Sequence, residues 1–168
     1  MSKSSATYAR MLSKVHRELE FTLKRPIYSV DTPPGTMENR VFIGGNYALM
    51  PVLREIERII HEYNYQPVIA YDFNIPKENT REYTLRLLNL CRVGIFEVTL
   101  SNGHLVELAR TTGFPETKIL QVYMALDQRK DTPKTMSVMV WQSTPPPVGY
   151  VTFDELEDIV LAFLSQKR

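Results

Sequence analysis

From residue 41 onward, short apolar runs alternate with segments whose apolar residues recur at helical spacing. The apolar runs are residues 41–43, 67–71, 92–98, 118–123 and 148–152. Helical spacing is clearest in residues 49–63 and in residues 154–164 near the end of the chain. Strands that alternate with helices favour right-handed crossovers between parallel strands. The pattern therefore predicts an α/β domain whose parallel sheet is covered by helices on both faces.

The first forty residues have a different pattern. Residues 6–23 repeat apolar side chains at steps of three and four, which predicts an amphipathic helix. Residues 25–40 hold three prolines and a glycine among polar residues, which is typical of a connector with turns. We therefore predict an N-terminal helix with its connector over residues 1–40, and the α/β domain over residues 41–168.

The last predicted helix follows a short strand at residues 148–152. Asp154 is a residue type that caps helix N-termini, and Glu157 follows three residues later, where a carboxylate can reach back to the cap. We therefore expect Asp154 to be the first residue of a capping box.

Composition narrows the partners and the location. A length of 168 residues suits one domain with a short extension. Twenty basic and nineteen acidic residues give a net charge of +1, which provides no field to attract nucleic acid or an anionic membrane. The single cysteine, Cys91, cannot form an internal disulfide, and no apolar run is long enough to span a bilayer. We expect a cytoplasmic protein that binds neither nucleic acid nor membranes, with Cys91 in its core.

Parallel sheets of this kind bind ligands beyond the carboxyl ends of their strands, so the loops after the predicted strands are the first places to look for a site. The first such loop is Gly44-Gly45-Asn46-Tyr47. Glycines there let the backbone approach a ligand, and the N-terminus of the following helix favours an anionic group such as phosphate. The alternative is a tight turn from strand to helix, because a glycine pair without a spaced third glycine is a weak motif.

The second loop contains Tyr71-Asp72-Phe73 after the second apolar run. An acidic side chain between aromatic rings is suited to binding sugar hydroxyls while a ring stacks on a base. The alternative is that the aspartate is a turn or helix-capping residue, which the loop taken by itself favours. The sequence leaves both interpretations open.

The third segment is Ser101-Asn-Gly-His-Leu-Val-Glu107, after the third apolar run. Ser101 or Asn102 can cap the next helix, which places Glu107 about one turn inside it. A carboxylate at the mouth of the sheet can attack an anomeric carbon or stabilise an oxocarbenium-like centre. The alternative is an ordinary exposed glutamate on a helix.

Other ionisable residues give weaker signals. Glu97, at the end of a buried strand, is either a second catalytic carboxylate or a residue that satisfies backbone donors. The histidines His16, His61 and His104 have no metal-ligand partner three or four residues away. We therefore expect no metal site.

The order of these motifs resembles the nucleoside 2-deoxyribosyltransferase-like family, which shares a flavodoxin-like architecture with Toll/interleukin-1 receptor (TIR) domains. The resemblance extends over residues 41–164. It is carried by Val41-Phe-Ile-Gly-Gly45, Tyr71-Asp72, Cys91-Arg-Val-Gly-Ile-Phe-Glu97 and Gly103-x-x-x-Glu107. It implies a three-layer α/β fold with a five-stranded parallel sheet of order 2-1-3-4-5, in addition to the N-terminal helix.

The resemblance also implies roles for individual residues. In the family, the glutamate of the Gly-x-x-x-Glu element is the nucleophile that takes the sugar from its base, and here that role falls on Glu107. The transferases usually carry an aspartate before the glycine, where this chain has Asn102. TIR domains that cleave NAD also use a glutamate in this region, preceded by a serine and followed by a leucine, as in Ser101 and Glu107-Leu108. Active sites in the family are often completed by a second subunit, which implies a homo-oligomer.

Two functions of different classes follow. The first is cleavage or transfer of an N-glycosidic bond in a nucleoside, nucleotide or NAD, with no cofactor unless NAD itself is the substrate. The second is a non-catalytic module that binds nucleotide, or assembles and signals as TIR domains do. A purely structural adaptor is a third reading. The predicted catalytic residues are Glu107, Asp72 and Asn102, and the predicted substrate-binding residues are Gly44, Gly45, Asn46, Tyr47, Tyr71, Phe73, Phe96 and Gly103.

Overall fold

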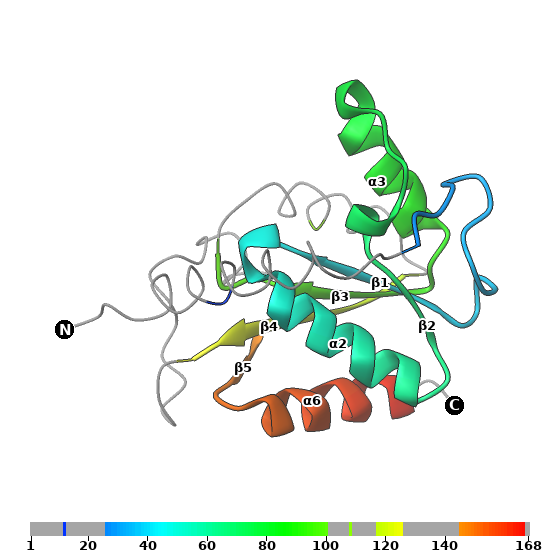
Figure 1. Cartoon of the computed structure of the whole chain (residues 1–168). Coiled ribbons are helices and arrows are strands. Elements are labelled where there is room, and N and C mark those ends of the chain that lie inside the picture. The colour runs from blue at the N-terminus through cyan, green and yellow to red at the C-terminus, as the bar shows by residue number, and fades with distance from the viewer. Residues whose placement is uncertain (1–11, 13–25, 101–107, 109–116, 126–144, 167–168) are drawn as a thin grey trace.

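The computed structural model describes residues 12, 26–100, 108, 117–125 and 145–166 (Figure 1). Five parallel strands form one sheet in the order β2-β1-β3-β4-β5. The strands are β1 (Arg40–Gly45), β2 (Gln66–Val68), β3 (Val93–Glu97), β4 (Lys118–Met124) and β5 (Val148–Tyr150). This order confirms the predicted flavodoxin-like α/β architecture.

Three helices that are described over their full length flank the sheet. Two of them, α2 (Met50–Glu62) and α6 (Phe153–Ser165), lie side by side on one face, and α3 (Thr80–Asn89) lies on the other (Figure 1). Short 3₁₀ turns occupy Tyr47–Leu49, Ala70–Asp72 and Lys77–Asn79. The predicted N-terminal helix, and the predicted helix around residue 107, fall largely outside the described residues. Leu12 and Leu108, which are described, are helical.

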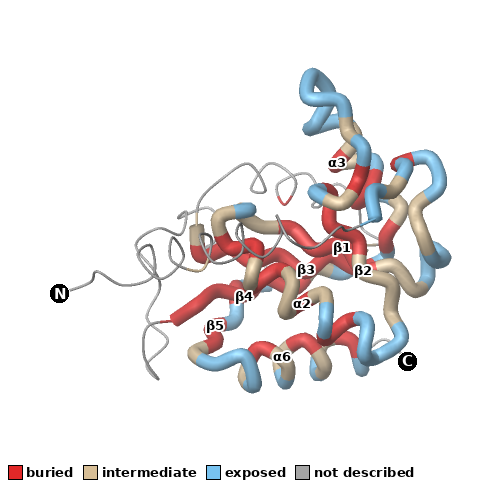
Figure 2. Tube along the Cα trace, in the orientation of Figure 1, coloured by how far each residue is buried: buried red, intermediate tan, exposed pale blue. Residues whose placement is uncertain are grey.

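Side chains of the strands alternate between two cores, as the pleat of a strand requires. Val41 and Ile43 point into the first core, between the sheet and α2 and α6. Phe42 points into the second core, between the sheet and α3. The strands are buried along most of their length, whereas the outer faces of the helices are exposed (Figure 2). Burial on both faces explains why the strands are continuous apolar runs in the sequence.

The α2 helix covers the sheet with an unbroken aliphatic stripe. Leu53, Ile56, Ile59 and Ile60 are fully buried, and they recur at steps of three and four. Burying each such side chain contributes roughly 1.5–3 kcal/mol. The stripe therefore fixes which side of α2 faces the sheet, and with it the position of the polar residues on its flank.

The start of α6 differs from the expectation. Thr152, rather than Asp154, caps the helix, since its hydroxyl accepts from the backbone N–H of Glu155. The Glu155 carboxylate in turn accepts from the backbone N–H of Val151 at 3.0 Å. The cap therefore lies two residues earlier than predicted, with the same three-residue spacing to a glutamate, and that glutamate bonds the residue before the cap instead of the cap itself.

The connector is bound to the amino end of the sheet by Arg40. Its guanidinium donates to the backbone carbonyls of Pro33, Pro34 and Gly35 at 2.8, 2.8 and 2.5 Å. Gly35 has a φ of +76°, a left-handed conformation that permits the turn. Earlier in the connector, Tyr28 forms an isolated parallel bridge with Phe73. The described part of the connector is thus part of the folded body.

Cys91 is buried at the end of α3, as expected. Burial raises the pKa of its thiol to about 12, which keeps it protonated and unreactive at neutral pH. None of the helices among the described residues is both long enough and apolar enough to cross a membrane.

Candidate functional site

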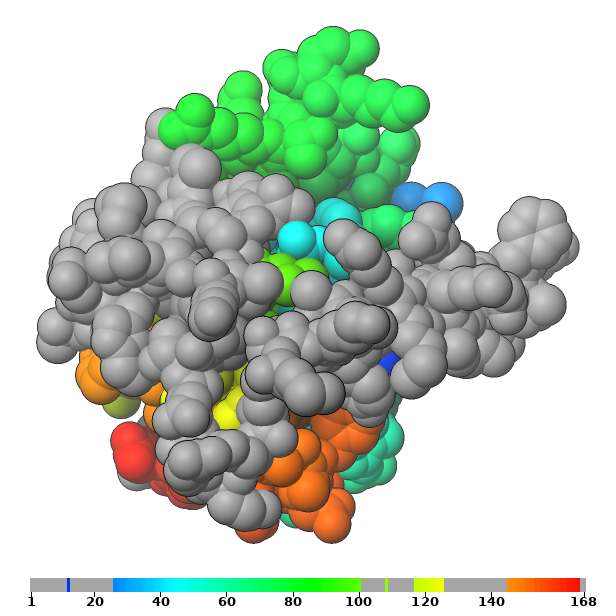
Figure 3. Space-filling view, turned by 90° about the vertical axis from the view of Figure 1, so that its left-hand side faces the viewer, coloured from blue at the N-terminus to red at the C-terminus, as the bar shows by residue number. Residues whose placement is uncertain are grey.

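The carboxyl ends of all five strands lie along one edge of the sheet, which Figure 3 views from the front. In the order 2-1-3-4-5, the chain direction across the sheet reverses between β1 and β3. Ligands of doubly wound sheets bind at this reversal. The segments that leave β1, β2 and β3 are therefore the candidate site.

The glycine pair at the end of β1 is required by packing. A Cβ atom at Gly44 would lie 2.6 Å from the ring of Phe96, and one at Gly45 would lie 2.8 Å from Leu53 and 3.3 Å from the Cβ of Glu97. No side chain fits at either position without movement of a neighbour. The close approach of β1 to β3 and α2 is thus a sufficient reason for both glycines.

Two predicted substrate-binding residues meet at this edge. Tyr47 follows β1 and Tyr71 follows β2, and their ring centroids are 5.2 Å apart in an edge-to-face arrangement. Their exposed fractions are 45% and 50%, so both rings face solvent. Asn46 has a local role, because its side chain accepts from the backbone N–H of Ala48 at 2.9 Å. The tyrosine pair forms an aromatic surface beside the ends of β1 and β2.

Asp72 lies next to this pair and binds an arginine of α2. Its two carboxylate oxygens accept from Arg54 at 2.5 and 2.6 Å, in the bidentate geometry of a strong ion pair. Both side chains are nearly buried, with exposed fractions of 10% and 12%. Arg54 also donates to Glu57 at 3.2 Å.

This environment acts on the guanidinium in two opposing ways. Burial lowers the pKa of Arg54, but its hydrogen bonds and charge interactions with Asp72 and Glu57 outweigh that effect and raise the pKa. Arg54 is therefore a permanent cation that fixes the orientation of the Asp72 carboxylate. A ligand hydroxyl at Asp72 has to share that carboxylate with the guanidinium.

The two phenylalanines predicted to contact substrate lie in the second core. Phe96 is fully buried and packs against Phe42, with ring centroids 5.8 Å apart. Phe73 is 7% exposed and packs against Tyr28 at 5.6 Å. Neither ring forms part of the exposed aromatic surface of Tyr47 and Tyr71. Stacking of a base on Phe96 would require the core to open.

Three predicted residues, Asn102, Gly103 and Glu107, lie outside the described residues. Leu108, which follows Glu107 in the sequence, is described and is 8% exposed. It belongs to the second core, together with Val98 after β3 and Ala125 after β4.

Glu97 lies at the carboxyl end of β3 and is fully buried. The Thr99 hydroxyl donates to its Oε1, and the Tyr150 hydroxyl donates to the same oxygen at 3.4 Å. Its Oε2 accepts from the backbone N–H of Thr99 at 3.3 Å. Thr99 Oγ1 also accepts from the backbone N–H of Met124 at 2.7 Å. The carboxyl group therefore connects the ends of β3, β4 and β5.

Burial raises the pKa of Glu97 to about 7, because removal from water penalises the charged form. Hydrogen bonds from Thr99, Tyr150 and the Met124 backbone oppose this shift without cancelling it. The carboxyl group thus exchanges a proton near neutral pH, a property common among functional residues. The sequence contains one hint of this, a glutamate within an apolar strand with a threonine two residues later.

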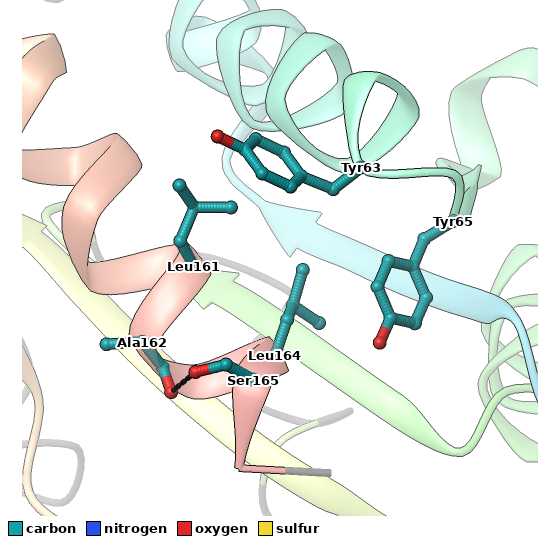
Figure 4. Close-up of a pocket in the computed structure, with 6 residues that line it drawn as sticks. All are labelled: Tyr63, Tyr65, Leu161, Ala162, Leu164 and Ser165. Carbon is teal, nitrogen blue, oxygen red and sulfur yellow. Dashed lines mark hydrogen bonds between the residues drawn. The ribbon is translucent and has the colours of Figure 1, made fainter. Parts of the chain in front are cut away.

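An apolar cavity lies at the other edge of the sheet, between the C-terminal ends of α2 and α6 (Figure 4). Its volume is about 330 Å³, and its lining residues are Tyr63, Tyr65, Leu161, Ala162, Leu164 and Ser165. The Ser165 hydroxyl donates to the Ala162 carbonyl at 3.0 Å, so its hydrogen bond is made within α6. Of the residues predicted to bind substrate, none that the structure describes lines this cavity.

Neither the described metal-binding side chains nor comparisons with known proteins point to a function. Within the described ranges, no three His, Cys, Asp or Glu side chains come together as metal ligands would. A scan against protein-family models finds no match, and a search of curated proteins finds none either. Any function proposed for this chain therefore has to come from its own residues.

Proposed function

We propose that this chain cleaves or transfers the N-glycosidic bond of a nucleoside, a nucleotide or NAD at the carboxyl edge of its sheet. The observation that carries the proposal is the exposed Tyr47–Tyr71 pair, which lies beside the buried Asp72–Arg54 ion pair. Aromatic rings offer a face or an edge on which a base can stack, and a fixed carboxylate can accept hydrogen bonds from ribose hydroxyls. Both features adjoin the strand-order reversal at which nucleotides bind in such folds.

The chemistry is assigned to Glu107, on the strength of the family resemblance. Its carboxylate attacks the anomeric carbon, or stabilises the positive charge there, as the bond from that carbon to the base nitrogen breaks. The base leaves with the bonding electron pair. The purine or pyrimidine of a nucleoside or nucleotide takes up a proton, whereas the nicotinamide of NAD leaves as a neutral molecule without one. Water or a second base then displaces the carboxylate from the sugar. Asn102 positions the ribose, and Gly103 leaves room for it.

Leu108 supports the assignment to this edge. It is buried with Val98 and Ala125, which directly follow β3 and β4 at the edge where Tyr47 and Tyr71 also lie. The residue before Leu108 in the sequence is Glu107. The proposal brings a carboxylate from this part of the chain and a base on the tyrosine pair to one site.

The proposal also covers the kind of ligand, the location of the enzyme and its assembly. The ligand is a small molecule, the enzyme acts in the cytoplasm, and a second copy of the chain completes the active site. The near-zero net charge agrees with a small ligand rather than a nucleic acid.

The experiment is a base-release assay. Purified protein is incubated with NAD and with ribo- and deoxyribonucleosides, and free base is followed by chromatography. We expect release from one substrate class, loss of release in Glu107→Gln, and a raised KM in Tyr47→Ala and Tyr71→Ala. Glu82→Gln, which alters an exposed glutamate of α3, is the matched control. Release that persists in Glu107→Gln would contradict the assignment.

The second candidate is a module that binds a nucleotide without turnover. It is favoured by the Asp72 carboxylate, which is already bonded to Arg54 through both oxygens. Such a group suits binding better than proton transfer, because both of its oxygens already accept hydrogen bonds from the guanidinium. Binding of nucleotide by the folded protein, with no base released from any substrate, would favour this candidate.

A further inference from the structure

Glu97 is the one charged residue among the buried side chains of the described chain. It lies on the same face of β3 as Val93 and Ile95, so its carboxyl group points into the first core at the carboxyl edge. Thr99, its nearest partner, is also fully buried. A buried ionisable group normally has a cation or several donors to compensate its charge.

Several of the described elements contribute groups near this carboxyl. Tyr150 of β5 is the titratable side chain among them, and β4 contributes the backbone N–H of Met124. On the side of β1, a Cβ at Gly45 would lie 3.3 Å from the Cβ of Glu97 and 2.8 Å from Leu53 of α2, and neither residue carries charge. Within the described ranges, no arginine, lysine or histidine pairs with Glu97. Among the described residues, hydroxyl and amide donors therefore compensate the charged form.

The hydrogen-bond pattern fits the charged form and conflicts with the neutral one. In the structure, Oε1 accepts from two hydroxyls and Oε2 accepts from a backbone N–H. A proton on Oε2 would share that oxygen with the Thr99 N–H, a donor that cannot turn. A proton on Oε1 would face the hydroxyls of Thr99 and Tyr150, which can turn. Uptake of a proton on Oε1, the oxygen with two donors, therefore requires one of the two hydroxyls to change from donor to acceptor.

Of the two hydroxyls, the one of Thr99 also bonds the backbone, so its reorientation would affect the backbone. Its Oγ1 already accepts from Met124 N–H, which joins the exit of β3 to the end of β4. If Oγ1 also accepts from a protonated Glu97, its own hydrogen must find another partner or the side chain must rotate. Either change acts on the residue that leads from β3 into the carboxyl edge.

We propose that Glu97 is a positioning residue, and that its proton, held or released, sets the hydrogen bonds of Thr99 and thereby the course of the chain where it leaves β3. Glu97 does not itself touch a ligand in this role, since it is fully buried. Its pKa of about 7 means that both states are populated near neutral pH. The effect of this group on turnover rests on the proposed function, whereas its effect on the β3 exit does not.

The test is a pH titration by NMR of protein labelled with ¹³C at the glutamate carboxyls and with ¹⁵N at the amides. We expect one carboxyl signal to titrate near neutral pH, to be missing in Glu97→Gln and to remain in Glu82→Gln. We also expect the amide signals of Thr99, Leu100 and Met124 to shift with the same midpoint. Amide shifts that do not follow the carboxyl, or that persist unchanged in Glu97→Gln, would overturn the proposal.

A second variant keeps the test decisive if Glu97→Gln does not fold. Tyr150→Phe retains the carboxyl and removes one hydroxyl that donates to its charged form. The midpoint should then move to higher pH, because the charged form loses stabilisation. A midpoint that stays in place would contradict the network.

The pH dependence of kcat/KM distinguishes a failure of this inference from a failure of the proposed function. If the protein releases base, its kcat/KM should inflect at the NMR midpoint, and Glu97→Gln should lose that inflection while keeping the substrate preference. An unchanged pH profile in Glu97→Gln would overturn the positioning role. If no base is released by the wild type, the proposed function fails, and the amide titration alone decides the inference.

Discussion

The ends of β1 and β2 differ from the end of β3 in what they offer to a ligand. After β1 and β2, the chain presents two half-exposed tyrosines and an ion pair close to the surface. After β3, the polar groups are buried and bonded to one another across three strands. The first region can contact a ligand directly. The second can act only by moving the chain around it, so one edge of the sheet combines a contact surface with a control element.

The difference extends to how each carboxylate is compensated. Asp72 is compensated by a cation, and Glu97 by neutral donors alone within the described ranges. Removal of the paired carboxylate leaves a nearly buried cation without its partner, whereas a buried carboxylate without a cation is driven toward its neutral form. Substitutions at the two positions should therefore differ in both size and pH dependence.

The largest effect on stability is expected from Asp72→Ala. The variant leaves the nearly buried Arg54 guanidinium without its bidentate partner, a change that costs about 3–5 kcal/mol when a buried pair is broken. Chemical denaturation at pH 7 measures this cost. Arg58→Ala is the matched control, because Arg58 belongs to an exposed ion network on α2 and α6 and its loss should cost far less. Equal losses of stability in Asp72→Ala and Arg58→Ala would show that the Asp72–Arg54 pair is effectively solvated.

Glu97 is expected to give a pH-dependent effect of similar size. Its folded pKa of about 7 lies above its ordinary value of 4.5, so the folded protein binds the proton more tightly than the unfolded chain. The stabilisation is then complete below pH 4.5 and is lost as the pH rises to 7, by roughly 3 kcal/mol in all. Thermal unfolding between pH 4.5 and 8 measures the slope.

The control for this slope is the Glu97→Gln variant, which cannot titrate at this position. Relative to wild type, it should gain stability as the pH rises from 4.5 to 7 and stay level above that range. A difference between the two proteins that does not change with pH would show that Glu97 has an ordinary pKa in the folded state.

The glycines at the end of β1 should give a smaller effect, and the two should differ. Gly44→Ala brings a methyl group against the packed ring of Phe96, whereas Gly45→Ala brings it against the flexible end of Leu53. Overpacking costs about 1–3 kcal/mol, and the rigid neighbour should give the upper part of that range. Denaturation midpoints show which of the two variants loses more stability. A larger loss in Gly45→Ala would show that Leu53, and not Phe96, is the more rigid neighbour.

The architecture could be predicted from the sequence because it depends on patterns that are local. Apolar runs separated by helical periodicities were sufficient to predict a parallel sheet, and the observed strand order agrees with the family resemblance. The start of α6 was misplaced because two overlapping pairs, Thr152 with Glu155 and Asp154 with Glu157, share the same spacing. Only the backbone conformation distinguishes them.

The site was harder to predict because its important contacts join distant parts of the sequence. Asp72 was recognised as a candidate, but its partner Arg54 lies on the preceding helix. Glu97 was left open, since Tyr150 and Met124 come from strands much later in the chain. Phe96 was predicted to contact the substrate, whereas its ring is fully buried in the second core. The apolar sequence of a strand that is buried on both faces does not show which of its side chains a ligand could reach.

The smallest effect on stability, and the most informative one for function, is expected from Tyr47 and Tyr71. Both rings are about half exposed, so Tyr47→Ala or Tyr71→Ala should change the free energy of unfolding by about 0.5 kcal/mol or less. If a base stacks on the pair, each substitution should weaken nucleotide binding about tenfold, the lower end of what one stacked base contributes. Calorimetric titration with nucleotide measures the affinity, and Tyr63→Ala, at the opposite edge of the sheet, is the control.

Loss of affinity in Tyr47→Ala but not in Tyr63→Ala would assign the base to the ends of β1 and β2. Equal affinities would move the search toward the exits of β3 and β4, because those are the remaining strand ends beside the reversal.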